Sequence, residues 1–182
     1  MTHLVTQRLQ RTTLMVALFC VIACTPALNW RSVSIGDTPV QMLFPCKPDH
    51  AARDVVLRVG ARDVPSNLSL QGCEAGGMQF TMGEIQLPEG ATQTEVLAAW
   101  RLASLAPLHV LPADAVTDAW QPKGVQITPP PVRARVMTQN HQVQWMWFAH
   151  ADRVFQAAVY GKPSDQGLPD AAEIYFSEIK WP

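Results

Sequence analysis

The sequence lacks the short motifs that mark the common catalytic sites. No serine stands in Gly-x-Ser-x-Gly, no glycine-rich loop is suited to hold a phosphate, and no histidine pair has the His-Glu-x-x-His spacing. There is no Cys-x-x-Cys pair for disulfide exchange. We therefore predict no catalytic residue, metal site or cofactor, although enzymes whose site residues are dispersed remain open.

Clusters of one charge are also absent. The 14 basic and 15 acidic residues are spread along the chain without runs and give a net charge of −1. Nucleic-acid binding requires a clustered basic surface, so nucleic acid is excluded as a partner. Only two tyrosines but fifteen prolines are present, with no low-complexity tract or visible repeat, which is typical of a globular domain with many rigid turns.

No apolar run is long enough for a permanent membrane span. Leu14 to Ala23 form a run of ten apolar residues, whereas a spanning helix needs roughly 20. Arg8 and Arg11 precede this run without any acidic residue, which is the pattern of a signal peptide. The arginines are not adjacent, so we expect export of an unfolded chain without a preloaded cofactor.

The residues Val21, Ile22, Ala23 and Cys24 resemble a bacterial lipobox. The resemblance implies that Cys24 receives a diacylglyceryl group and that the signal, residues 1–23, is removed. The alternative is an ordinary signal peptide, because Val21 and Ala23 also satisfy its small-residue rule.

The lipobox resemblance also implies a location. Thr25 stands where aspartate retains lipoproteins at the inner membrane, so the resemblance favours the outer membrane, facing the periplasm. One acyl chain anchors weakly, but two or three hold a protein almost permanently. We therefore expect a lipid-anchored protein that meets an envelope partner.

The remaining cysteines support export. If Cys20 leaves with the signal and Cys24 carries lipid, the domain keeps Cys46 and Cys73. Two thiols in an oxidising compartment should pair, and the bridge is worth about 3 to 4 kcal/mol in the chain-entropy model. The alternative is two unpaired buried thiols.

Cleavage before Cys24 leaves about 159 residues, enough for one domain with a core. We assign residues 24–35 to a lipidated tether and residues 36–182 to a single α+β domain. Alternating apolar residues predict strands at 39–45, 54–60, 132–138, 142–150 and 153–161, and a hairpin at 67–87 that turns at Gly76 and Gly77. The segment 108–123 has no clear pattern.

Two helices are predicted. Thr92 and Glu95 form a capping box before an apolar stripe that includes Trp100 and Ala103, and Pro107 follows. A closing helix at 169–181 places Ala171 and Ile174 along one side. Strands punctuated by two helices predict an α+β fold, an antiparallel sheet covered by the two main helices on one face.

The segments LFPCKP (43–48), GMQFTMGEIQLP (77–88) and AAEIYFSEIKW (171–181) resemble PsbP-like domains. This diffuse resemblance implies an α/β/α sandwich. It also implies an assembly or accessory role at membrane complexes, because most members of the group are not enzymes. It carries no site residues over to this chain.

Two distributed sites are possible for an enzyme. Cys46 lies four residues before His50 and could be a thiolate nucleophile, but a bridged cysteine in a solvated turn is the simpler interpretation. His141 and His150 flank one strand and could share a distant site, but exposed strand ends are the more ordinary explanation.

Two features could contact a ligand. Trp145 and Trp147 share one face of a strand and could line an apolar groove or a sugar platform, but the continuous hydrophobicity favours a central strand buried on both faces. Arg133 and Arg135 alternate with apolar residues and could meet acidic lipid or glycan from an open sheet face. A solvated face is the alternative.

The sequence therefore predicts a periplasm-facing bacterial lipoprotein with a non-catalytic binding or accessory role in the cell envelope. The alternatives are an envelope enzyme with a distributed site near Cys46 and His50 or near His141 and His150, and a carrier of an apolar ligand.

Overall fold

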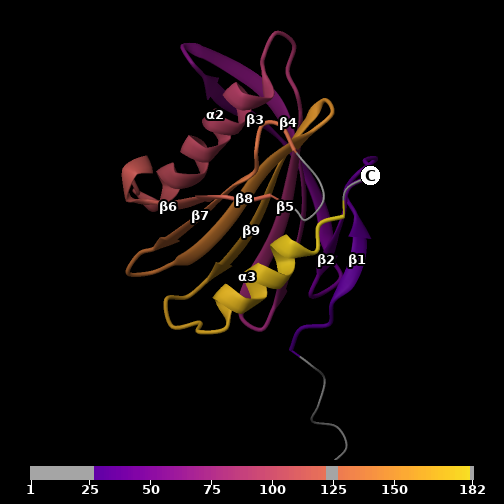
Figure 1. Ribbon diagram of the computed structural model, residues 1–182, viewed down its shortest axis with the longest axis vertical. Helices are drawn as coiled ribbons and strands as arrows, with labels where there is room; N and C mark the ends of the chain where they lie inside the picture. The colour runs from indigo at the N-terminus through magenta and orange to yellow at the C-terminus, as the bar shows by residue number, and fades with distance from the viewer. Residues whose placement is uncertain (1–26, 122–126, 181–182) are drawn as a thin grey trace, which may run out of the picture.

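The structure is a computed structural model that describes residues 27–121 and 127–180 (Figure 1). The predicted signal peptide and Cys24 lie outside the described residues. The elements are β1 (Arg31–Ser34), β2 (Gln41–Phe44), β3 (Asp49–Val59), β4 (Arg62–Ala75), β5 (Met78–Gln86), α2 (Gln93–Leu105), the 3-10 turns η1 (Ala106–Leu108) and η2 (Pro112–Asp114), β6 (Val116–Ala119), β7 (Val132–Met137), β8 (Gln142–His150), β9 (Arg153–Gly161) and α3 (Leu168–Ser177). No helix in the described segments is both long and apolar enough to cross a membrane.

Seven strands form one antiparallel sheet in the order β3-β4-β5-β9-β8-β7-β6, and β1 and β2 form a separate pair. The predicted α+β class is confirmed. The predicted hairpin is β4–β5, where Gly76 and Gly77 have φ of 60° and 77° at the turn. The predicted strand at 54–60 begins earlier, at Asp49, so the solvated turn after β2 ends at Pro48.

The main sheet is buried on both faces. One core contains Trp145 and Trp147 with α2, and the other contains Met146 and Phe148 with α3 and β2. In Figure 1, α3 lies beside the β1–β2 pair, while α2 lies next to the β3–β4 hairpin. The expectation that both helices cover one face is wrong. A strand that is apolar on both faces requires cover on both.

Local sequence determines α2. The Thr92 hydroxyl accepts a hydrogen bond from Glu95 N at 3.3 Å, and Thr92 N donates to Glu95 Oε2 at 2.9 Å, so the predicted capping box is confirmed. Trp100 is buried over Gly83, where a Cβ atom would lie 2.9 Å from the indole ring. Ala103, expected in the apolar stripe, is exposed because α2 ends two residues later and leaves the sheet beyond it uncovered.

The closing helix α3 is shorter than the predicted span of 169–181. Tyr175 packs edge-on against Phe44 and Phe80, each with ring centroids 5.3 Å apart. Ile174, expected on the buried side, is 41% exposed. The buried stripe runs instead through Ala171, Ala172 and Phe176, because the helix faces both the main sheet and the small one.

The predicted tether is shorter than residues 24–35. Arg31–Ser34 form β1, which pairs with β2, and Ile35 is 1% exposed. This segment is short and mostly polar, so its sequence has little β propensity. It forms a strand because β2 offers an edge to which it can pair. The segment 108–123, which has no sequence pattern, contains η2 and β6.

The Cys46–Cys73 disulfide is confirmed, with the two Cα atoms 6.0 Å apart. Cys46 follows β2 and Cys73 lies in β4, so the bond fastens the small sheet to the main sheet. Trp30 adds an edge-on contact with Phe80, at 6.0 Å between ring centroids.

Replacing both bridge residues, Cys46→Ala with Cys73→Ala, should lower the free energy of unfolding by about 3 kcal/mol, because the unfolded chain loses its 28-residue closed loop. Urea denaturation followed by far-UV circular dichroism measures the change. Reduced wild-type protein is the matched control and should show the same loss. An unchanged unfolding midpoint in both would show that the bridge does not stabilise the domain.

Candidate ligand-binding groove

A groove opens between the second half of α2 and the floor of the sheet. Its volume is about 430 Å³, within the usual range for small-molecule sites. We call it the α2 groove. Its apolar lining includes Val55, Leu57, Leu68, Leu70, Ile85, Trp100, Pro107 and Leu108. Its polar lining is Arg53, Gln79, Thr81, Ser104, Gln156 and Tyr160.

The groove exists because α2 is too short for the strands beneath it. Its 13 residues extend about 20 Å, whereas the 14 residues of β4 extend about 45 Å. Pro107 ends the helix, and His109 adopts a left-handed φ of 55° that turns the chain away. The sheet beyond Ser104 is therefore left without a helical cover.

Polar groups meet on the groove floor because neighbouring strands bring them into register. Gln79 of β5 lies opposite Tyr160 of β9, and Gln156 lies opposite Gly83. Gln156 Nε2 donates to Ser104 Oγ at 2.6 Å, and Ser104 Oγ donates to the carbonyl of Trp100 at 2.8 Å. These bonds fix the floor against the last turns of α2.

Tyr160 supplies a hydroxyl at one side of the groove. Its oxygen accepts a hydrogen bond from Trp145 Nε1 at 3.4 Å, and the two rings meet edge-on at 6.3 Å. Burial raises the pKa of Tyr160, so the phenol is neutral at physiological pH. A neutral phenol that accepts one hydrogen bond still has its own proton to donate.

The sequence does not reveal this site. Gln79 and Thr81 alternate with the apolar residues of β5, a pattern typical of a water-facing side, yet Thr81 is only 9% exposed and both line the groove. Polar residues inside otherwise apolar strands, such as Gln156 in β9, could have indicated a site. The sequence does not show that they lie together, because this depends on the pairing of β5 with β9, which are distant in the chain.

A second cleft of about 540 Å³ lies where β7 extends past β6. β6 pairs only with Val132 to Arg135, and the cleft is lined by His109, Asp114 and Arg135 among others. Although it is larger, we consider it the weaker candidate. Its apolar lining includes the buried Val136 and Val143, but also side chains in solvent, such as Met137, which is 65% exposed. The floor of the α2 groove is fixed by the hydrogen bonds of Gln156 and Ser104.

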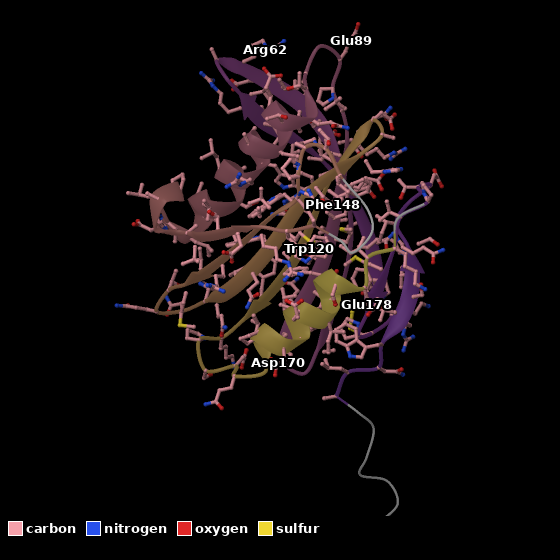
Figure 2. The ribbon with its side chains drawn as sticks, in the orientation of Figure 1. Arg62, Glu89, Trp120, Phe148, Asp170 and Glu178 are labelled. Carbon is pink, nitrogen blue, oxygen red and sulfur yellow. A yellow bond between two sulfur atoms is a disulfide. The ribbon has the colours of Figure 1, made fainter. Side chains whose placement is uncertain are left out.

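The two arginines predicted on an open face have different surroundings. Arg133 is covered by α3: it pairs with Glu173 at 2.6 Å, and its guanidinium lies 4.9 Å from the Trp120 ring centroid and 5.3 Å from that of Phe176. Figure 2 shows Trp120 beside α3. An open-face role for Arg133 is therefore excluded by its packing. Arg135 remains exposed and lines the second cleft.

Trp145 and Trp147 are core residues. They are 0% and 1% exposed, and their rings stack 5.7 Å apart beneath α2. This is the arrangement of the buried central strand that the continuous hydrophobicity favours, and it presents no open sugar platform. Trp145 reaches the groove only through its bond to Tyr160.

The possible enzyme residues do not assemble into one site. Cys46 Sγ is bonded to Cys73 and is therefore not a free thiolate. His50 lies in β3, opposite Gln71. His141 and His150 lie at opposite ends of the extended β8, about 30 Å apart, so no single site holds both. No group of three metal-ligating side chains occurs in residues 27–121 or 127–180.

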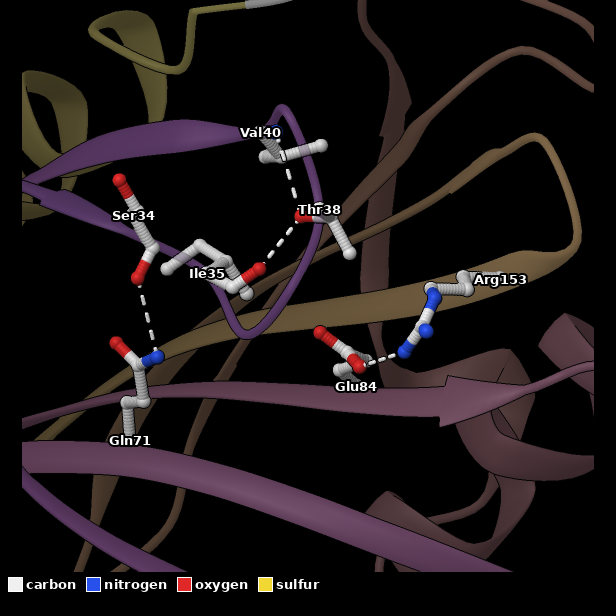
Figure 3. Close-up of polar contacts among 7 residues, drawn as sticks. All are labelled: Ser34, Ile35, Thr38, Val40, Gln71, Glu84 and Arg153. Carbon is white, nitrogen blue, oxygen red and sulfur yellow. Dashed lines mark hydrogen bonds and ion pairs between the residues drawn. The ribbon is translucent and has the colours of Figure 1, made fainter.

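A buried polar contact seats the small sheet on the main one (Figure 3). Gln71 Nε2 of β4 donates to the carbonyl of Ser34 in β1 at 3.2 Å, which joins the two sheets. Nearby, within the main sheet, the 6% exposed Glu84 of β5 pairs with Arg153 of β9. Gly36 has a φ of 52° and lies so close that a Cβ there would be 2.7 Å from Glu84 Oε2. Any larger residue at this position would displace the loop.

Over residues 27–121 and 127–180 these features define the class of the protein: an α+β domain with a large antiparallel sheet, a second small sheet, two helices and one disulfide. No protein family model, no curated protein and no solved structure matches the chain.

The buried Glu84 should make stability depend on pH. Burial raises its pKa above the usual 4.5, and the neighbouring Arg153 offsets this only in part. The folded state therefore holds the Glu84 proton to a higher pH than the unfolded state does, so stability falls as pH rises from about 4.5 through the folded pKa.

Glu84→Gln removes this titration and should flatten the decline in urea midpoint above pH 4.5. Glu89→Gln, which changes an exposed loop carboxylate, is the matched control and should keep the wild-type decline. Equal pH profiles for wild type and Glu84→Gln would contradict the assignment.

Proposed function

We propose that the mature chain is a lipid-anchored protein of the bacterial cell envelope with a non-catalytic binding role, and that the α2 groove is its binding site. The lipobox resemblance at Val21 to Cys24 supports the anchor, most simply in the outer membrane facing the periplasm. The Cys46–Cys73 bridge supports an oxidising compartment.

The observation that carries the binding role is the composition of the groove. Its walls are mainly apolar, and a few hydrogen-bonding groups converge on one floor, which is the usual pattern of a small-molecule site. The groove therefore suits an apolar or amphipathic ligand, as expected of an apolar-ligand carrier. The anchor would hold the domain at a membrane surface, close to such ligands and to an envelope protein partner.

The alternative of an envelope enzyme has less support from the geometry. Its nucleophile candidate, Cys46, is bridged, and its histidines are dispersed over separate elements. In contrast, the polar groups of the α2 groove, such as Gln156 and Ser104, form hydrogen bonds with one another. Such pairs position a ligand without providing a base or a nucleophile.

Cys24→Ala should abolish lipidation and yield unlipidated precursor or soluble protein, so that any processed form leaves the membrane fraction. Fractionation of cells, followed by mass spectrometry of the N-terminal peptide, measures this. Cys20→Ala, which changes a cysteine of the discarded signal, should leave lipidation unchanged. Membrane retention of Cys24→Ala in processed form would refute the anchor.

The groove is tested with the apolar fluorophore N-phenyl-1-naphthylamine and the soluble fraction of Cys24→Ala, which carries no acyl chains. We expect saturable binding with a blue-shifted emission. Ala103→Trp fills the groove from an exposed helix position and should weaken binding about tenfold, or about 1.4 kcal/mol.

The control Ala113→Trp makes the same change at an exposed site in η2, outside the groove, and should bind as the parent does. Absence of saturable binding, or equal weakening by both variants, would argue against the groove as the binding site.

A further inference from the structure

The strand β3 is an open edge of the main sheet. It is the terminal strand, and within residues 27–121 and 127–180 it pairs only with β4. Its register with β4 runs without interruption from Asp49 opposite Gly72 to Val59 opposite Arg62. Every second residue of such a strand directs its backbone N–H and C=O away from the sheet, as a template for another strand.

Several of the usual devices that block strand addition are missing from β3. It contains no proline and no bulge, and at eleven residues it is long. The opposite edge, β6, has only four residues. The sheet therefore has one edge that is suited to pairing, and it is β3.

The outer face of β3 carries an apolar residue between two charges. Val55, Leu57 and Val59 turn towards α2, so Asp54, Val56 and Arg58 lie on the opposite face. All three are exposed, and Val56 is 64% exposed. This pattern is self-complementary: when two copies lie antiparallel with their valines opposed, the acidic residue of each copy is opposite the basic residue of the other.

Charge distinguishes the registers that two copies can adopt. Two identical antiparallel strands are related by a two-fold axis perpendicular to the sheet. Each residue is therefore opposite a residue of the second copy whose side chain projects from the same face of the sheet. A register centred on Asp54, or on Arg53, opposes that residue with its own copy, and opposed like charges destabilise the pair. A register centred on Val55 forms no charge pair. A register centred on Ala51 pairs Asp49 with Arg53, but it joins only residues 49–53, whereas a register centred on Val56 joins residues 53–59.

We propose that two copies of this chain pair antiparallel through β3, with the two Val56 side chains in contact at the two-fold axis. In this register Asp54 faces Arg58 of the second copy, and the axis repeats the ion pair on the other side of Val56. The two seven-stranded sheets become one, and the exposed valines are buried against each other.

Pairing in this register also joins the binding sites. Val55 and Leu57 line the α2 groove, and across the axis Val55 faces Leu57 of the second copy. The two grooves would therefore adjoin along a shared apolar wall. This consequence rests on the proposed function, whereas the pairing itself does not.

Sedimentation equilibrium of the full lipidated protein in a density-matched detergent tests the pairing. We expect a reversible dimer. Arg58→Asp places aspartates opposite Asp54 of the second copy and should raise the dissociation constant about tenfold. The double variant Asp54→Arg with Arg58→Asp restores opposite charges and should return the constant close to the wild-type value.

Asp63→Arg is the matched control. Asp63 lies on β4 and pairs with Arg58 within the chain at 2.8 Å, so this variant disrupts the internal ion pair but leaves β3 unchanged. It should not weaken the dimer as Arg58→Asp does. Val56→Lys places two like charges in contact at the two-fold axis and provides a second disruption, independent of the charge reversals; because Val56 also borders the α2 groove, its readout is the dissociation constant alone.

A protein that is monomeric at about 100 µM, well above the micromolar range of transient protein pairs, overturns the proposal. So does failure of the double variant to recover, or a loss of dimer with Asp63→Arg equal to that with Arg58→Asp. Probe binding by the soluble Cys24→Ala protein separates the two proposals. If the wild-type protein is monomeric while Cys24→Ala still binds N-phenyl-1-naphthylamine, the pairing is refuted and the groove stands.

Discussion

The central strands β5, β8 and β9 carry apolar side chains on both faces, and the other elements are arranged to cover them. In β8, Trp145 and Phe148 point in opposite directions and are both fully buried. Leaving either face in water would cost about 25 cal/mol for each Å² of exposed apolar surface. One face is covered by α3 with the small sheet and the other by α2, and this division gives the three layers.

The elements on the two faces of the main sheet cover it to different extents, and this difference determines where the candidate site lies. On one face α3 and the β1–β2 pair pack side by side, and the hydrogen bond from Gln71 to the Ser34 carbonyl joins the small sheet to the main one. On the other face α2 stops at Leu105 and leaves the strands beyond it as the groove floor. The β3–β4 hairpin thus contributes both to the groove and to the open sheet edge.

Features determined by local sequence could be predicted, and features determined by distant pairing could not. The capping box at Thr92 and the turn at Gly76 depend on neighbouring residues, and both are present as expected. The environment of Arg133 depends on Glu173, forty residues away, and the polar floor depends on the pairing of β5 with β9. Alternation within a strand indicates two faces but does not reveal which element will cover each one.

The disulfide has a consequence for timing as well as for stability. The residues before Cys46 add only a two-stranded pair, which is marginal by itself, and the bond to Cys73 ties that pair to the main sheet. In a reducing cytosol this tie does not form. Before this bond forms, the small sheet is therefore held only by its non-covalent contacts with the main sheet. Oxidation of Cys46 and Cys73 completes its attachment.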